Sequence, residues 1–311
     1  MSLASKVFAV DNEFFDKNGK PRYMDDNYFR ARYYRFINVK ERSRRRKGKC
    51  AMPGCSNKCV SSHTIPESSV LKRIASAKDV FYPKYNADIN AYECVSIKTK
   101  KASVFPGFCN KHENWFSGFE KNGNFYDPSM AIQNLRIICR YYFAWDSLLK
   151  VFERTLLKYR KEIEDYQNEK IDLLNTELGT DVTLKSVEDE NTKHMKQQIA
   201  FIRSQMTHIH NNDLYPFIKT MEGDGDYVSV IAVDVNIELP ACLAGKSEFV
   251  AGDKKYTVHL SVFPYLNGTF CCFSVNKDSE EHFRRLLGKY KDDYEFIGFI
   301  ESGICGTSIN K

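Results

Sequence analysis

Residues 50–63 read CAMPGCSNKCVSSH, and residues 105–114 read FPGFCNKHEN. In the first stretch two cysteines flank a Pro-Gly turn, and the second contains a Cys-x-x-His pair. Two such knuckles, brought together from distant parts of a chain, build a tetrahedral zinc site. We therefore expect a structural Zn²⁺ ion. The expected ligands are Cys50, Cys55, Cys109 and His112.

Two residues of the first stretch leave alternatives open. Cys59 competes with Cys50 as a ligand, because Cys55-x-x-x-Cys59 is also a permitted spacing for zinc. His63 lies just after the knuckle, where it is a candidate general base, a further zinc ligand or a turn histidine. The remaining cysteines are interpreted as small buried apolar residues. They are Cys94, Cys139, Cys242, Cys271, Cys272 and Cys305.

The bulk composition is that of a soluble globular protein with room for more than one domain. The chain has 311 residues, of which 42% are hydrophobic and 28% charged. It has no apolar run of the ~18 residues that a membrane helix needs. Met1–Val10 lacks the pattern of a secretory signal, so the ten cysteines are expected to be reduced thiols in the cytoplasm.

The net charge of +6 is concentrated in one segment. Lys40–Lys49 holds seven basic residues and one acidic residue, so the rest of the chain is close to neutral. A basic run beside a metal knuckle is typical of a phosphate-binding footprint, although a solvated basic linker has the same composition. The expected nucleic-acid contacts are Arg42, Arg44, Arg45, Arg46, Lys47 and Lys49.

The chain divides into three regions and predicts an α+β protein. Residues 1–126 hold the knuckles, residues 127–216 are helical, and residues 223–311 are a small α+β domain. In the helical region apolar residues recur at alternating spacings of four and three, which predicts a long antiparallel, coiled-coil-like hairpin that turns at 179–182 and ends before Pro216. Its first helix is longer than the second, which favours a homo-oligomer or a protein partner.

Shorter elements are predicted from local patterns. Thr64 and Glu67 have the spacing of a capping box, followed by a helix over 68–77. Asn267-Gly268 predicts a β-hairpin turn. The other expected elements are strands within 80–100, at 227–237, 255–265, 269–275 and 295–300, and a helix at 280–290.

Residues 45–145 resemble the HNH, or ββα-metal, endonucleases, in particular their zinc-bearing branch and a set of uncharacterised bacterial HNH-like proteins. The sequence Ser62-His63-Thr-Ile-Pro66 is similar to the Asp-His-Ile-x-Pro opening of that family. The sequence Cys109-Asn-Lys-His112-Glu113 is similar to its closing motif. Ser62 replaces an acidic residue, and Glu113 replaces the closing histidine.

The resemblance implies a zinc-bearing ββα-metal head and a set of catalytic roles. His63 would be the general base that activates water for attack on a phosphodiester. Glu113 would bind a catalytic Mg²⁺ or Mn²⁺ ion, and either Asn114 or Asn110 would orient the site. It also implies that such a protein is an effector of a bacterial anti-phage defence system.

Two functions follow from the sequence. The first is a metal-dependent endonuclease acting on DNA, or less readily on RNA. The second is a catalytically inactive adaptor that binds nucleic acid or protein, in which the zinc knuckles are purely structural. The intact histidine motif favours the enzyme, whereas Ser62 in place of an acid favours the adaptor.

Overall fold

The computed structural model describes residues 48–52, 54–86, 91–122, 124–125, 128–179 and 190–308. Several expected features lie outside these residues: most of the turn at 179–182 and the basic residues Arg42, Arg44, Arg45, Arg46 and Lys47. The chain divides into two compact units. One includes Ala144–Met206, and the other includes Lys40–Lys84, Tyr92–Phe143 and Thr207–Lys311.

The second unit contains a small head built on two antiparallel strand pairs. Strand β1 (Ser61–His63) pairs with β4 (Val104–Pro106), with His63 opposite Val104. Strand β2 (Asp79–Asn86) pairs with β3 (Ala91–Lys98), as the sequence predicts for residues 80–100. The turn η3 (Thr99–Lys101) joins β3 to β4.

Short helical elements follow each half of the head. The helix expected over 68–77 is shorter: it consists of η2 (Glu67–Leu71) and α3 (Lys72–Ile74), and the backbone is extended at Ala75. After β4 come α4 (Asn110–Glu113), η4 (Asn114–Phe116) and α5 (Ser117–Asn122). The paired strands β1 and β4 are thus followed along the chain by helix α4, with β2 and β3 forming a separate pair between β1 and β4.

The expected capping box at Thr64 is wrong. The backbone N–H of Thr64 donates to the carbonyl of Ser103, so Thr64 is part of the link between β1 and β4. Pro66 precedes the helical turn instead, and the Glu67 carboxylate accepts from the Thr99 hydroxyl. The Thr64 hydroxyl accepts from Arg140, so tertiary partners have taken both side chains that a capping box would use.

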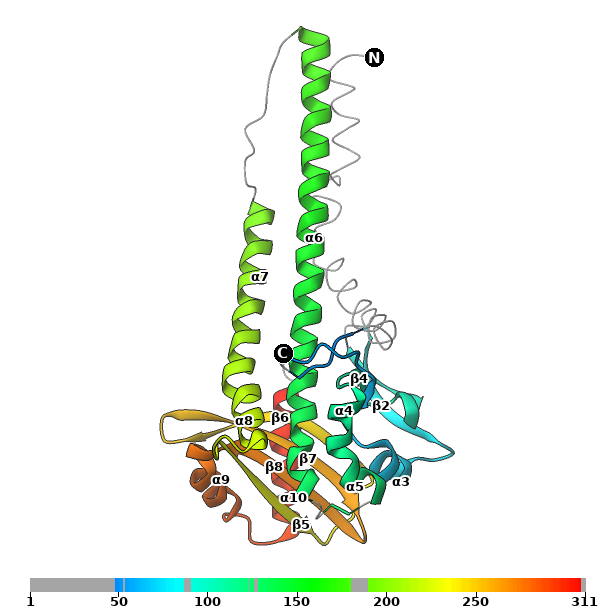
Figure 1. Ribbon diagram of the computed structural model, residues 1–311, viewed down its shortest axis with the longest axis vertical. Coiled ribbons are helices and arrows are strands. Elements are labelled where there is room, and N and C mark those ends of the chain that lie inside the picture. Colours follow the sequence, from blue (N-terminus) through cyan, green and yellow to red (C-terminus); the bar gives the residue numbers. More distant parts are fainter. Residues whose placement is uncertain are drawn as a thin grey trace. The chain divides into compact units, whose positions relative to one another are not determined.

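The predicted long helices are present. The turn η5 (Pro128–Ile132) leads into α6 (Gln133–Leu178), and α7 (Glu190–Ile209) follows further along the chain (Figure 1). Within the first unit these two helices contact one another. The rings of Trp145 and Phe201 lie 6.1 Å apart, and Arg203 pairs with Glu153 at 2.8 Å.

The prediction that the helical region ends before Pro216 is wrong, because helical structure continues after α7 as far as Glu222. A π-helical turn, η6 (His210–Leu214), leads directly into α8 (Tyr215–Glu222), which ends at Gly223 with φ of 75°. Pro216 lies in the first turn of α8, and the Asn212 carbonyl four residues earlier accepts a hydrogen bond from the Asn276 side chain at 3.4 Å.

The C-terminal part of the second unit is a four-stranded antiparallel sheet in the order β5-β8-β7-β6 (Figure 1). The strands are β5 (Val228–Val235), β6 (Leu243–Ala251), β7 (Lys254–Tyr265) and β8 (Gly268–Asn276). The hairpin predicted at Asn267-Gly268 is confirmed, with Tyr265 opposite Gly268. Strand β6 was missed because LAGKSEFVA has little alternation of apolar and polar residues.

The sheet buries both of its faces. Alternate residues of β7, Val258, Leu260 and Val262, share a core with Phe283 of α9 (Glu280–Leu287) and Phe296 of α10 (Asp293–Ser308). On the opposite face, Asn134 of α6 bonds to β7 and β8: its amide nitrogen donates to the carbonyls of His259 and Cys272 at 3.1 and 3.2 Å. The start of α6 is thus anchored to the sheet.

The strand expected at 295–300 is wrong, because these residues belong to α10. The Asp292 carboxylate accepts from the backbone N–H groups of Tyr294 and Glu295, and the Glu295 carboxylate accepts from the N–H of Lys291. This reciprocal capping starts a helix. The apolar run FIGFI is too short to distinguish a strand from a buried helix face by its periodicity alone.

The remaining cysteines are mostly buried, as expected. Cys139, Cys271 and Cys272 are buried and Cys242 is half-buried, but Cys94 is exposed, contrary to expectation. The side chain of Cys305 lies outside those described. The structure combines helices with antiparallel sheets, consistent with an α+β fold. None of the described helices combines the length and the apolar character that crossing a membrane requires.

Candidate metal centre

Four side chains of the head converge on one point. The ligand atoms of Cys50, Cys55, Cys109 and His112 all lie within 4.8 Å of one another. His112 Nδ1 lies 3.2 Å from Cys50 Sγ and 3.5 Å from Cys109 Sγ, and the sulfurs of Cys55 and Cys109 are 3.9 Å apart. Zn–S bonds of about 2.3 Å at tetrahedral angles place sulfurs roughly 3.8 Å apart. This donor set therefore fits a metal ion such as zinc.

Backbone hydrogen bonds shape the two knuckles. The Cys55 N–H donates to the Met52 carbonyl across a turn that contains Gly54 with φ of 73°, a conformation that favours glycine. The Ala51 N–H donates to the Gly107 carbonyl, which ties the first knuckle to the second. Cys109 immediately precedes α4, so His112 lies one helical turn further on and faces the same point.

Cys59 lies outside the cluster. It is buried, and a Cβ built on Gly48 would come within 2.9 Å of its sulfur, so the thiol packs against the backbone at Gly48. Within the described residues, Cys50, Cys55, Cys109 and His112 form the only such group.

The protonation of the cluster is set by burial and hydrogen bonds. Burial raises the pKa of Cys50 to about 12. Burial also acts to raise the pKa of Cys109, but hydrogen bonds from the backbone N–H of His112, from neighbouring thiols and from the N–H of Lys111 outweigh it and lower this pKa. Burial lowers the pKa of His112, which keeps the ring neutral and able to bind a metal. Cys109 is thus the ligand best prepared as a thiolate.

His63 ends β1, opposite Val104 of β4. Its ring donates a hydrogen bond to the Lys100 carbonyl, and its Nε2 atom is buried without a hydrogen-bond partner. Burial is the main cause that lowers its pKa; Glu67 opposes this shift and Arg136 reinforces it. The ring is therefore neutral near pH 7, the form that can accept a proton.

Glu113 is engaged by two partners. The Ser62 hydroxyl donates to its Oε2 at 2.7 Å, and the guanidinium of Arg136 on α6 lies 2.6 Å from its Oε1. Burial raises the pKa of Glu113, and Arg136 and the Ser62 hydroxyl oppose that shift. An acid at position 62 would place a second carboxylate against Glu113, so the serine of this chain suits its partner.

Arg136 was not singled out from the sequence. Its side chain is 0% exposed, pairs also with Glu120 at 2.6 Å, and stacks on the Phe116 ring at 3.8 Å. The available signal was a basic residue between Leu135 and Ile137 in an otherwise apolar stretch of helix. Such a residue is buried only when it is paired.

The surroundings of Glu113 do not fit a Mg²⁺ or Mn²⁺ ion. Both carboxylate oxygens already accept hydrogen bonds, and the buried Arg136 cation 2.6 Å away would repel a second cation. Apart from the zinc-type cluster, no three His, Cys, Asp or Glu donors converge in the described part of the chain. Asn110 and Asn114, the two candidate orienting residues, are both exposed.

Of the expected nucleic-acid contacts, Lys49 is the one within the described residues. It is exposed and forms an isolated bridge with Lys58, on the knuckle that carries Cys55. Its position places positive charge beside the metal cluster.

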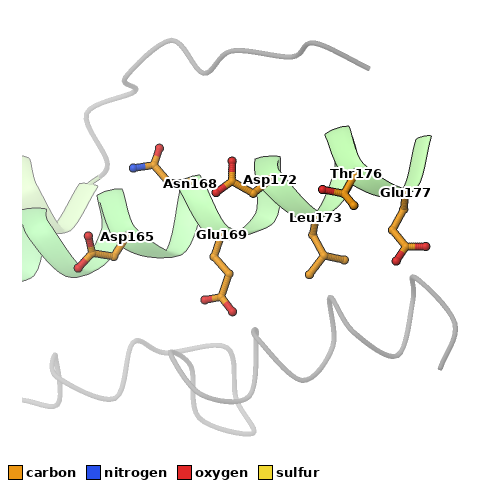
Figure 2. A pocket seen from close by; sticks show the side chains of 7 residues that line it. All are labelled: Asp165, Asn168, Glu169, Asp172, Leu173, Thr176 and Glu177. Atoms are coloured by element: carbon orange, nitrogen blue, oxygen red, sulfur yellow. The ribbon is translucent and has the colours of Figure 1, made fainter. Parts of the chain in front are cut away.

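A separate hollow lies along α6 and is lined by acidic and polar side chains. Figure 2 shows Glu169 and Glu177 pointing to one side of the helix and Asp172 to another, so the carboxylates do not converge. This is the arrangement of a solvated helix face, and it gives no cation site.

Comparison with protein-family models, with curated proteins and with solved structures gave no match. The function must therefore be argued from the residues and their geometry.

Proposed function

We propose that this chain is an HNH-type endonuclease that cuts DNA phosphodiester bonds, with a zinc ion holding its head together. The observation that carries the proposal is the order β1, β4, α4, with His63 at the end of the first strand and the Cys-x-x-His pair at the start of the helix. This is the order that the resemblance to ββα-metal enzymes implies.

In this proposal His63 is the general base. The Lys100 carbonyl holds one side of the ring, which leaves Nε2 as the atom that takes a proton from the attacking water. A neutral imidazole suits this role near pH 7. The metal cluster fixes the second knuckle against the first and so keeps β1 and α4 together.

The biological setting and partners are further parts of the proposal. By the resemblance, the enzyme acts as an effector in bacterial anti-phage defence, where uncontrolled cutting would be toxic. Helix α6 has 46 residues and α7 has 20, which leaves α6 with length for a second protomer or a partner protein.

The test is a plasmid-cutting assay. Zinc-loaded protein is incubated with supercoiled plasmid without added metal, with Mg²⁺ and with Mn²⁺, because Glu113 as folded is not arranged to hold either ion. The wild type and a His208→Ala control, which alters an exposed histidine, should cut equally. His63→Ala should cut at least ~100-fold more slowly, the usual contribution of a general base. Wild-type cutting by His63→Ala would remove His63 from the chemistry.

The second candidate is a non-enzymatic adaptor that binds nucleic acid or protein. The observation in its favour is that Glu113 is already paired with a fully buried arginine and that His63 Nε2 is shielded from solvent. In this case no variant cuts plasmid under any of the three conditions, while the zinc content stays normal.

A further inference from the structure

The backbone brings three lysines of the head together. The N–H of Thr99 in η3 donates to the Lys78 carbonyl at 3.0 Å, which joins η3 to the turn before β2. Lys78 itself has φ of 70°, so the turn is tight. Lys100 and Lys101 complete η3. Two segments that are separate in the sequence thus meet at Lys78 and Thr99, and Lys100 and Lys101 directly follow that junction.

These three lysines are exposed and have no acidic partner among the described residues. The nearby acids are already engaged. Asp79 pairs with Lys98 at 2.8 Å, and Glu67 accepts a hydrogen bond from the Thr99 hydroxyl. No ion pair among the described residues involves Lys78, Lys100 or Lys101, and exposed charges of this kind attract an anionic partner.

The same turn holds the candidate base. The carbonyl of Lys100 accepts the hydrogen bond from the His63 ring, so the lysine surface begins at the residue that fixes His63 in place. The η3 turn therefore links these lysines through the backbone to the residue proposed as the base.

We propose that Lys78, Lys100 and Lys101, which we call the η3 lysine surface, bind the phosphate backbone of nucleic acid. The inference deepens the proposed function, since it rests on that function for the role of His63, and it supplies a contact that the basic run at 40–49 did not predict. Lysines bind phosphates as point charges and without base recognition, so the contact is independent of sequence and weakens with salt.

The experiment measures binding of a fluorescein-labelled duplex by anisotropy at several salt concentrations, with zinc-loaded protein and no added Mg²⁺ or Mn²⁺. The test variant is Lys78→Ala/Lys100→Ala/Lys101→Ala. The matched control is Lys254→Ala/Lys255→Ala/Lys289→Ala, which removes the same charge from exposed sites in the C-terminal part of the same unit. Both variants must retain zinc and unfold at the wild-type temperature.

We expect the test variant to bind at least tenfold more weakly at moderate salt. The slope of log K against log salt should become shallower by about 0.9 for each phosphate contact removed. The control should match the wild type in both quantities. Equal affinity and slope for the two triple variants would overturn the inference. A wild type that does not bind the duplex would overturn it as well. So would a wild type whose lysines are needed only for binding to anionic vesicles and not to the duplex.

The binding and cutting assays separate the two proposals. If the wild type cuts plasmid and the test variant binds the duplex as tightly as the wild type, the endonuclease proposal stands and the role of the η3 lysine surface is rejected. Lysine-dependent binding without cutting in any condition retains the surface and favours the adaptor.

Discussion

Arg136 on α6 and Glu113 on α4 form an ion pair of 2.6 Å in which the arginine side chain is completely buried. Glu113 directly follows the candidate metal ligand His112, and Ser62 of β1 donates to the same carboxylate. One buried cation therefore joins the strand that carries the His63 motif, the helix that carries the metal ligands and the long helix α6.

Replacing Arg136 should destabilise the protein strongly. Arg136→Leu leaves Glu113 and Glu120 without their buried counter-charge, and breaking such a pair costs about 3–5 kcal/mol. The measurement is urea unfolding of the zinc-loaded protein. Arg284→Leu, which breaks the exposed pair with Glu280, should cost no more than about 1 kcal/mol. Similar losses of unfolding free energy in the two variants would mean that the buried charge of Arg136 stabilises the protein no more than an exposed ion pair does.

Zinc content should distinguish the cysteines of the first knuckle. The wild type should bind one zinc per chain, Cys109→Ser and Cys50→Ser should lose it, and Cys59→Ser should keep it, because the Cys59 sulfur lies outside the ligand cluster. The measurement is metal release to a chromogenic chelator from unfolded protein. Retention of zinc by Cys50→Ser together with its loss from Cys59→Ser would show that Cys59 is the ligand.

Acid should destabilise the sheet through His259. Burial lowers the pKa of His259 from 6.5 to about 4, with Asp213 opposing and Lys246 reinforcing the shift. The unfolded chain binds the His259 proton more tightly than the folded protein does. The free energy of unfolding is therefore highest above pH 6.5, where His259 is neutral in both states, and it decreases as the pH falls to about 4. The loss is about 3 kcal/mol.

Unfolding free energies measured between pH 7 and 4 check this prediction. His259→Gln should flatten the pH dependence in that window, whereas His208→Gln, at an exposed histidine, should leave it unchanged. An unchanged slope in His259→Gln would assign the acid sensitivity to other groups.

Asn134 should be needed to attach α6 to the sheet. Its amide also donates to Ser274 Oγ at 2.9 Å and accepts from Ser261 Oγ at 2.7 Å. Asn134→Leu leaves these buried groups unsatisfied, at a cost of about 1–3 kcal/mol for each. Asn168→Leu, at an exposed position of the same helix, is the control in thermal unfolding. A cost of under about 0.5 kcal/mol for Asn134→Leu would contradict the role.

The sequence predicted features whose cause is local. Ligand spacing placed the two knuckles, and the alternating spacing of apolar residues predicted the long helices. The Asn267-Gly268 signal identified the hairpin between β7 and β8. Each of these features depends on residues within a few positions of one another, so a short stretch of sequence is enough to predict it.

Features that depend on distant partners could not be predicted. The role of Arg136 depends on Glu113 and Glu120, which come from a different helix each, and the Thr64 pattern was overridden by Ser103 and Thr99. The helix at 295–300 was missed because its start depends on Asp292, which lies outside the apolar run. The η3 lysine surface is assembled by the pairing of two turns, which leaves no pattern in the sequence.

The segment Thr64–Ser103 leaves the β1–β4 pair and returns to it at a single point, since its first N–H donates to its last carbonyl and His63 lies opposite Val104. In topological terms it is a cassette inserted between two strands that are held together independently by their own pairing and by the knuckles. Loop-closure entropy grows slowly, by only about 0.6 kcal/mol for each doubling of loop length. The pairing of β1 with β4 therefore tolerates a change in the length of this cassette at a small cost in chain entropy, whereas the bonds of its Thr64 carbonyl to Gln133 of α6 and of its Ser68 hydroxyl to Glu120 of α5 must be kept.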